Sequence, residues 1–247
     1  QTAVEDTLRY DAQPLIQTRV RKNGAFANRT TGNMACAVFY DTLARPVNGV
    51  EDMHDHAHAY IPNVTWDPVE QCFKAIEYED LHLFRPYLEA CFHARLSALV
   101  TSLGYPIERQ GKWWDIALAD SIIDKFSRRT KAVEKKAKEL GILDENGRVL
   151  DPVALAGLGA STRDPKSKSK DLSPEELRAE WWRRLTPEEL RALDRVASGG
   201  GPENSGPLAG QIPLKEALDY GIGSVFARKT VASDMELMEP ALRRGFG

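Results

Sequence analysis

The sequence predicts an α+β fold, in which an antiparallel sheet with packed helices is followed by an all-helical C-terminal segment. Residues 34–40 form an apolar run typical of a buried strand, and residues 53–60 form a second expected strand. The turn residues from Pro46 to Gly49 lie between them and favour a hairpin-like antiparallel pair. After residue 158 no further strand pattern is present, and several helix starts follow.

The first part of the chain is expected to combine short strands with two longer helices. The helix expected over residues 86–103 begins with a proline and ends before Gly104. The helix expected over residues 121–140 begins at a capping box of Ser121 and Asp124. Further strands are expected over residues 64–66, 72–76 and 113–116.

The last third of the chain contains clear helix starts. Ser173 and Thr186 each precede Pro-Glu-Glu, which is a capping-box start with proline at the first helical position. Two short helices are therefore expected here. Two more are expected over residues 213–229 and 234–244, the last entered at Ser233.

Composition indicates an ordinary globular protein. The 247 residues are 42% hydrophobic and 28% charged, with a net charge of −3. There is no apolar run of about 18 residues, and the start of the chain does not resemble a signal peptide. Cys36, Cys72 and Cys91 are odd in number, widely spaced and set among apolar residues. We therefore expect reduced core thiols in a cytoplasmic protein with no membrane partner.

The charge is unevenly distributed along the chain. Residues 125–138 contain seven basic side chains and one acidic side chain. A local patch of this kind, rather than the net charge, decides binding to a polyanion. The same composition also describes the solvated face of a helix, so both interpretations stay open.

Three of the five histidines lie in the expected strand 53–60. His54, His56 and His58 have a spacing of two, so their side chains should project from one face of the strand. Neighbouring imidazoles on one face can bind a single metal ion. The alternative is a solvated strand face that carries histidines without a metal.

A series of short motifs occurs in a defined order. They are Arg29-Thr-Thr-Gly-Asn33, Phe39, Ala44 to Gly49, Asp52, His56-Ala-His58, Asn63, Lys74-Ala75, Pro86-Tyr87, Phe92 to Leu96, Leu103-Gly-Tyr105 and Phe126 to Thr130. Together they resemble the central block of conjugative relaxases of the TrwC/TraI type, the MobF class. The resemblance covers about residues 15–145, and weaker likeness continues to the end of the chain.

The resemblance implies an HUH-type relaxase fold, here partial, and a defined chemistry. Such relaxases nick one strand of plasmid DNA at a transfer origin through a tyrosine that becomes joined to the 5′ end, and they later rejoin the strand. Three histidines hold a divalent cation that polarises the scissile phosphate. The His-x-His pair of the family corresponds to His56 and His58 in this sequence.

The family's third histidine corresponds to Asp41 in this sequence. With His56 and His58, Asp41 would give two imidazoles and one carboxylate, a set that favours Mg²⁺ or Mn²⁺ and also admits Zn²⁺. His54 could be the third ligand instead, or the site could have lost tight metal binding.

The resemblance also implies a tyrosine nucleophile that precedes the Thr-Thr-Gly-Asn block by a long stretch. Tyr10, Tyr40 and Tyr60 do not match that place, so no catalytic residue is assigned. We expect an internal relaxase fragment that lacks the N-terminal tyrosine region and does not nick DNA alone. The alternative is a non-catalytic single-stranded-DNA-binding module derived from a relaxase. An unrelated metal hydrolase ranks last, because no further acidic ligand or general base is spaced in the sequence as such a site would require.

The expected partner is single-stranded DNA, and other conjugation proteins could also bind. Within the basic segment, Arg128, Arg129 and Lys125 are the expected phosphate contacts. The expected domains are a relaxase domain (1–158), a basic linker (159–172), a short helical segment (173–197), a Gly/Pro linker (198–212) and the helical start of a following domain (213–247).

Overall fold

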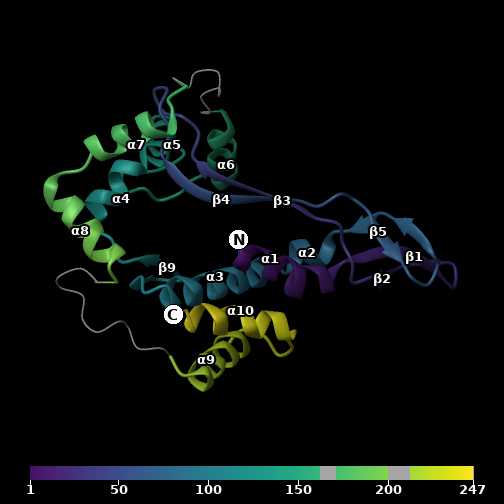
Figure 1. The fold of residues 1–247 in the computed structure, drawn as a ribbon. Helices are drawn as coiled ribbons and strands as arrows, with labels where there is room; N and C mark the ends of the chain where they lie inside the picture. Colours follow the sequence, from purple (N-terminus) through teal and green to yellow (C-terminus); the bar gives the residue numbers. More distant parts are fainter. Residues whose placement is uncertain (162–170, 200–211, 247) are drawn as a thin grey trace. The chain divides into compact units, whose positions relative to one another are not determined.

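The computed structural model describes residues 1–161, 171–199 and 212–246. These residues form short antiparallel strand pairs with packed helices, followed by helices alone, which confirms the predicted α+β class (Figure 1). Contacts group the chain into two compact units. Unit 1 consists of Gln1–Tyr40, Ala57–Ala117 and Arg195–Gly247, and unit 2 consists of Asp41–His56 and Leu118–Asp194. The expected domain boundaries depend on two linkers that lie mostly outside the described residues, so they stay predictions.

Helices make up about half of the described residues. They are α1 (Thr2–Asp6), η1 (Thr7–Ala12), η2 (Gln13–Leu15), α2 (Glu79–Leu83), α3 (Arg85–Ser102), α4 (Asp120–Phe126), α5 (Arg128–Glu139), α6 (Pro152–Ser161), α7 (Pro174–Arg183), α8 (Pro187–Ala197), α9 (Leu214–Phe226) and α10 (Asp234–Arg244). The strands are β1 (Gln17–Lys22), β2 (Ala25–Thr30), β3 (Ala37–Leu43), β4 (Met53–Tyr60), β5 (Thr65–Asp67), β6 (Cys72–Lys74), β7 (Ile76–Glu77), β8 (Ile107–Gln110) and β9 (Trp113–Ile116).

The strands form one three-stranded sheet, in the order β2-β1-β7, and the pairs β3-β4, β5-β6 and β8-β9. The β1–β2 hairpin turns at Asn23 and Gly24, whose φ angles of 52° and 83° suit a two-residue turn. The hairpin-like pairing expected for the histidine strand is present as β3–β4. The expected strand over residues 72–76 is divided into β6 and β7, which pair with β5 and β1 respectively.

Unit 1 is built around α3, which buries Ala90, Cys91 and Ser97. Helix α10 packs against both α3 and α9 (Figure 1). The two C-terminal helices approach closely at Gly221, where a Cβ atom would lie 2.6 Å from the carbonyl oxygen of Leu237. A glycine is needed here because any side chain would overlap the neighbouring backbone.

In unit 2 the single helix expected over residues 121–140 is two helices, α4 and α5. The break is at Ser127, whose φ and ψ of −97° and 29° leave the α-helical region and whose Oγ donates to the carbonyl oxygen of Ile123 at 2.8 Å. The expected capping box at Ser121 is also wrong, because α4 begins one residue earlier and its N-cap is Ala119. Three other expected caps are confirmed, with reciprocal hydrogen bonds joining Ser173 to Glu176, Thr186 to Glu189 and Ser233 to Glu236.

The expectation of three core thiols is corrected by the structure. Cys91 is buried on α3, whereas Cys36 and Cys72 are exposed. Cys72 lies in the two-stranded pair β5–β6, and so small a sheet cannot bury both of its faces. No helix among the described residues has the length and apolar character needed to cross a membrane.

Candidate functional site

The predicted histidines lie on β4, the longer strand of the β3–β4 pair. The imidazole rings of His54 and His56 stack, with centroids 4.6 Å apart and ring planes at 23°. The two side chains therefore project from one face of the strand, as their spacing predicts. Nδ1 of His56 lies 2.7 Å from the carbonyl oxygen of His54, a contact that orients the imidazole ring.

Asp41 lies on β3, the strand that pairs with β4. Its Oδ1 accepts a hydrogen bond from the backbone N of Leu43 at 3.1 Å. Across the part of the chain that the structure describes, no three His, Cys, Asp or Glu side chains are gathered as a metal site would require. The structure therefore joins His54 and His56 and does not assemble the set of His56, His58 and Asp41.

The predicted DNA-contacting Arg128 makes an internal contact in unit 2. Its Nε donates to both carboxylate oxygens of Asp52, at 2.9 and 3.0 Å, and Asp52 is only 2% exposed. The same guanidinium donates from Nη2 to the carbonyl oxygen of Val50 at 2.8 Å and from Nη1 to that of Val47 at 3.3 Å. Arg128 therefore ties the N-terminus of α5 to the turn that precedes β4.

A second arginine completes this buried network. Nη1 of Arg184 also donates to Oδ1 of Asp52, and the Arg184 side chain is 14% exposed. Nε1 of Trp181, one turn earlier on α7, donates to the carbonyl oxygen of Glu51 at 2.9 Å. The buried Asp52 carboxylate is thus shared by two guanidinium groups, which is how a charge is tolerated away from water. Sequence reasoning noted Asp52 only as one motif residue and did not predict this role.

The other two predicted cations also have partners within unit 2. Nη2 of Arg129 donates to the carbonyl oxygen of Gly159 at 2.8 Å. Lys125 forms an ion pair with Glu189 at the N-terminus of α8. The hydrogen bond from Lys125, with that from the backbone N of Thr186, lowers the pKa of Glu189 to about 2.

Helix α5 also carries basic residues with weaker partners. Lys131 pairs with Asp124 at 3.0 Å and Lys136 pairs with Glu139 at 3.1 Å, and all four side chains are about half exposed. Exposed pairs of this kind exchange readily for other partners, because each contributes little free energy. Lys131 and Lys136 are therefore held loosely on α5, whereas Arg128 and Arg129 are hydrogen-bonded within unit 2.

Comparison with known proteins identifies the family. A family profile described as "TrwC relaxase" matches residues 1–187. The comparison with curated proteins gives no match.

Solved structures of conjugative relaxase TrwC share the fold. A metal-free TrwC structure in complex with oriT DNA is 26% identical, with a TM-score of 0.66, and the match covers 77% of this chain and 64% of that one. A metal-bound complex of TrwC with oriT DNA is 26% identical, with a TM-score of 0.65, over 74% of this chain and 60% of that one.

A third TrwC structure, with a 27-mer DNA comprising the recognition hairpin and the cleavage site, is 26% identical, with a TM-score of 0.64, over 74% of this chain and 62% of that one. The chain thus spans less than two thirds of the solved relaxases that it matches. With the profile match over most of its length, the chain belongs to the TrwC relaxase family.

Proposed function

We propose that this chain is part of a conjugative relaxase that binds single-stranded DNA at a transfer origin and takes part in nicking and rejoining it. Membership of the TrwC relaxase family supports this, as do similar TrwC structures in complex with oriT DNA. The observation in this chain that carries the proposal is the stacked pair of His54 and His56 on β4, in the strand that also holds His58.

The metal site of the proposal uses His56 and His58 on β4 and Asp41 on the paired strand β3. A metal-bound TrwC structure supports a metal in this family. The donors fit in part: two imidazoles from alternate positions of one strand suit a divalent cation, and the contact between His56 Nδ1 and the backbone holds one ring in a ligating orientation. A bound cation would neutralise charge on the phosphate oxygens.

The third ligand has two candidates. Asp41 supplies a carboxylate and would favour Mg²⁺ or Mn²⁺. His54 is favoured by its ring contact with His56 at 4.6 Å, and a third imidazole would shift the preference towards Zn²⁺.

Calorimetric titration with Mn²⁺ and Zn²⁺ tests the metal site. We expect the unaltered chain to bind one ion, and the His56→Ala/His58→Ala variant to lose that binding. His82→Ala removes an exposed histidine of α2 and serves as the control. Equal uptake by the double variant and the unaltered chain would exclude these ligands. Loss of binding in Asp41→Ala or in His54→Ala identifies the third donor.

The catalytic part of the proposal concerns the whole protein. We expect residues 1–247 to bind labelled single-stranded DNA without forming a covalent adduct, because no tyrosine of this chain is assigned as the nucleophile. The complete reading frame, supplied with the same DNA and metal, should form a phosphotyrosine adduct. If the complete protein binds DNA and forms no adduct, the chain is a non-catalytic DNA-binding module instead.

A further inference from the structure

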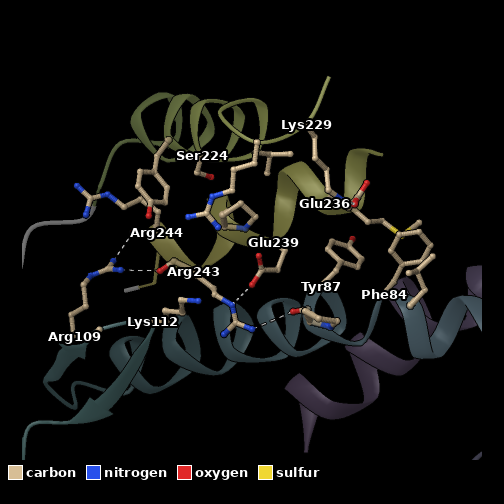
Figure 2. Close-up of a pocket in the computed structure, with 18 residues that line it drawn as sticks. Phe84, Tyr87, Arg109, Lys112, Ser224, Lys229, Glu236, Glu239, Arg243 and Arg244 are labelled. Carbon is tan, nitrogen blue, oxygen red and sulfur yellow. Dashed lines mark hydrogen bonds and ion pairs between the residues drawn. The ribbon is translucent and has the colours of Figure 1, made fainter. Parts of the chain in front are cut away.

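Unit 1 contains a cavity of about 560 Å³ that no part of the proposed relaxase site uses. It is an open pocket, bordered by α9 and α10 on one side and by the start of α3 and the β8–β9 hairpin on the other (Figure 2). This volume is within the range of pockets that bind small organic ligands.

Positive charge dominates the lining of this pocket. Its basic side chains are Arg109, Lys112, Arg228, Lys229, Arg243 and Arg244, and its acidic side chains are Glu236 and Glu239. Both carboxylates already have partners, because Glu236 pairs with Lys229 and Glu239 pairs with Arg243. The remaining cations are therefore not balanced from within the pocket.

Three of the lining cations have no carboxylate partner among the described residues. Arg109 donates to the carbonyl oxygens of Arg243 and Arg244, and burial together with the charge of Arg244 lowers its pKa. Lys112 and Arg228 are exposed, and their side chains make no hydrogen bond or ion pair with any residue in the described ranges. An anion bound here would relieve this mutual repulsion.

Two buried donors in the same wall lack acceptors. Arg243 is 9% exposed, and its Nη1 has no hydrogen-bond partner although its other nitrogens bind Glu239 and Glu89. Nε of Arg244 is likewise buried without a partner. Unsatisfied buried donors are uncommon because each loses its hydration without compensation, and they point to a missing acceptor.

The two ends of the pocket differ in chemistry. Figure 2 shows Phe84 and Tyr87 at one end, and Arg109, Lys112 and Arg244 at the other. An aromatic end can stack against a planar ring, and a cluster of arginine and lysine side chains can bind phosphate oxygens.

We propose that this pocket binds a nucleotide, with its phosphate at the cationic end and its base against Phe84 and Tyr87. The nucleotide is either free or one unit of a DNA strand, since both present the same phosphate and base. The inference goes beyond the relaxase function proposed above, because it uses none of His54, His56, His58 or Asp41.

Calorimetric titration of residues 1–247 with deoxythymidine monophosphate, thymidine and inorganic phosphate tests the proposal. The monophosphate should bind at least about tenfold more tightly than thymidine, which lacks the anion, and than phosphate, which lacks the base. The Lys112→Gln/Arg228→Gln variant should weaken monophosphate binding by about tenfold or more, since it removes the two cations that have no internal partner.

The control variant is Arg9→Gln/Arg21→Gln, which removes the same charge from exposed positions of unit 1 outside the pocket. It should leave the dissociation constant within about twofold of the unaltered value. Equal weakening in both variants, equal binding of thymidine and the monophosphate, or no monophosphate binding at millimolar concentration would overturn the proposal. Displacement of the monophosphate by hexathymidylate assigns the pocket to a strand, and failure to displace it assigns the pocket to free nucleotides.

Discussion

Arg128 holds Asp52 with its Nε 2.9 and 3.0 Å from the two carboxylate oxygens, at a position where the Asp52 side chain is almost entirely withdrawn from water. Arg184, the C-cap residue of α7, also pairs with this carboxylate. Asp52 thus accepts hydrogen bonds from both Arg128 and Arg184, and these bonds join the turn before β4 to two helices of unit 2.

Removing this acceptor should destabilise the protein strongly. Asp52→Ala leaves two partly buried guanidinium groups without their anion, so we expect a loss of about 3 kcal/mol in the free energy of unfolding. Urea denaturation followed by circular dichroism measures the loss. Glu175→Ala breaks only an exposed pair with Arg178, and it should change the unfolding free energy by less than about 0.5 kcal/mol. A similar small effect for both variants would contradict the role given to Asp52.

The basic residues of α5 should differ from one another in DNA binding. Arg129→Ala should reduce the magnitude of the slope of log K against log salt concentration by about 0.7, where K is the binding constant for single-stranded DNA, because one phosphate contact is lost. Arg128→Ala should instead lower the melting temperature, since its guanidinium is engaged with Asp52. Fluorescence anisotropy across a salt series and thermal melting separate these effects. An unchanged salt slope for Arg129→Ala would indicate that its bond to the Gly159 carbonyl is its main role.

Two glycines of α9 form a matched pair for testing the packing of the C-terminal helices. A Cβ atom at Gly221 would lie 2.6 Å from the Leu237 carbonyl oxygen and 2.8 Å from the Ala241 Cβ, whereas one at Gly223 meets nothing within 4 Å. Gly221→Ala should therefore destabilise the protein by about 1–3 kcal/mol through overpacking.

Gly223→Ala should stabilise it by up to about 1 kcal/mol, because alanine has the higher helix propensity. Thermal and urea denaturation of both variants measure the difference. A change of stability in the same direction for both substitutions would contradict the close approach of α9 and α10 at Gly221.

The ion pair between Lys125 and Glu189 predicts a loss of stability in acid. The pKa of Glu189 is lowered from its ordinary value of 4.5 to about 2, so the folded state holds the ionised form more strongly than the unfolded state does. The stabilisation is complete above pH 4.5 and is lost as the pH falls towards 2.

The free energy of unfolding of the Glu189→Gln variant should therefore depend less on pH across this window than that of the unaltered chain. Urea midpoints measured at intervals between pH 6 and about pH 2.5 make the comparison, with Glu175→Gln as an exposed control. Parallel pH curves for Glu189→Gln and the unaltered chain would show that the pair does not contribute.

Local sequence signals predicted the elements that depend on neighbouring residues. The capping boxes at Ser173 and Thr186 follow from residues three apart, and the shared face of His54 and His56 follows from strand alternation. The break at Ser127 was missed because it interrupts an otherwise regular apolar stripe, and a single serine carries no strong signal.

Features that join distant segments could not be predicted in this way. The partnership of Arg128 with Asp52 spans 76 residues, and nothing in either neighbourhood selects the other. The pocket of unit 1 likewise combines cations from the β8–β9 hairpin with cations from the α9–α10 loop and from α10. These segments are far apart in the sequence, so the sequence does not show that their charges lie together. Such sites depend on tertiary packing, which periodicity and capping do not specify.

The bonds from Arg109 to the backbone of α10 have a consequence for biosynthesis. Arg109 and its acceptor, the carbonyl oxygen of Arg243, are 134 residues apart, and at a translation rate of about 5–20 residues per second that interval is on the order of ten seconds. During this time the surface of α3 that α10 will cover stays in contact with water. Asp41–His56 of unit 2 is already made by then, and Leu118–Asp194 is synthesised within the same interval, so unit 2 can fold on the ribosome before the last segment of unit 1 has been made.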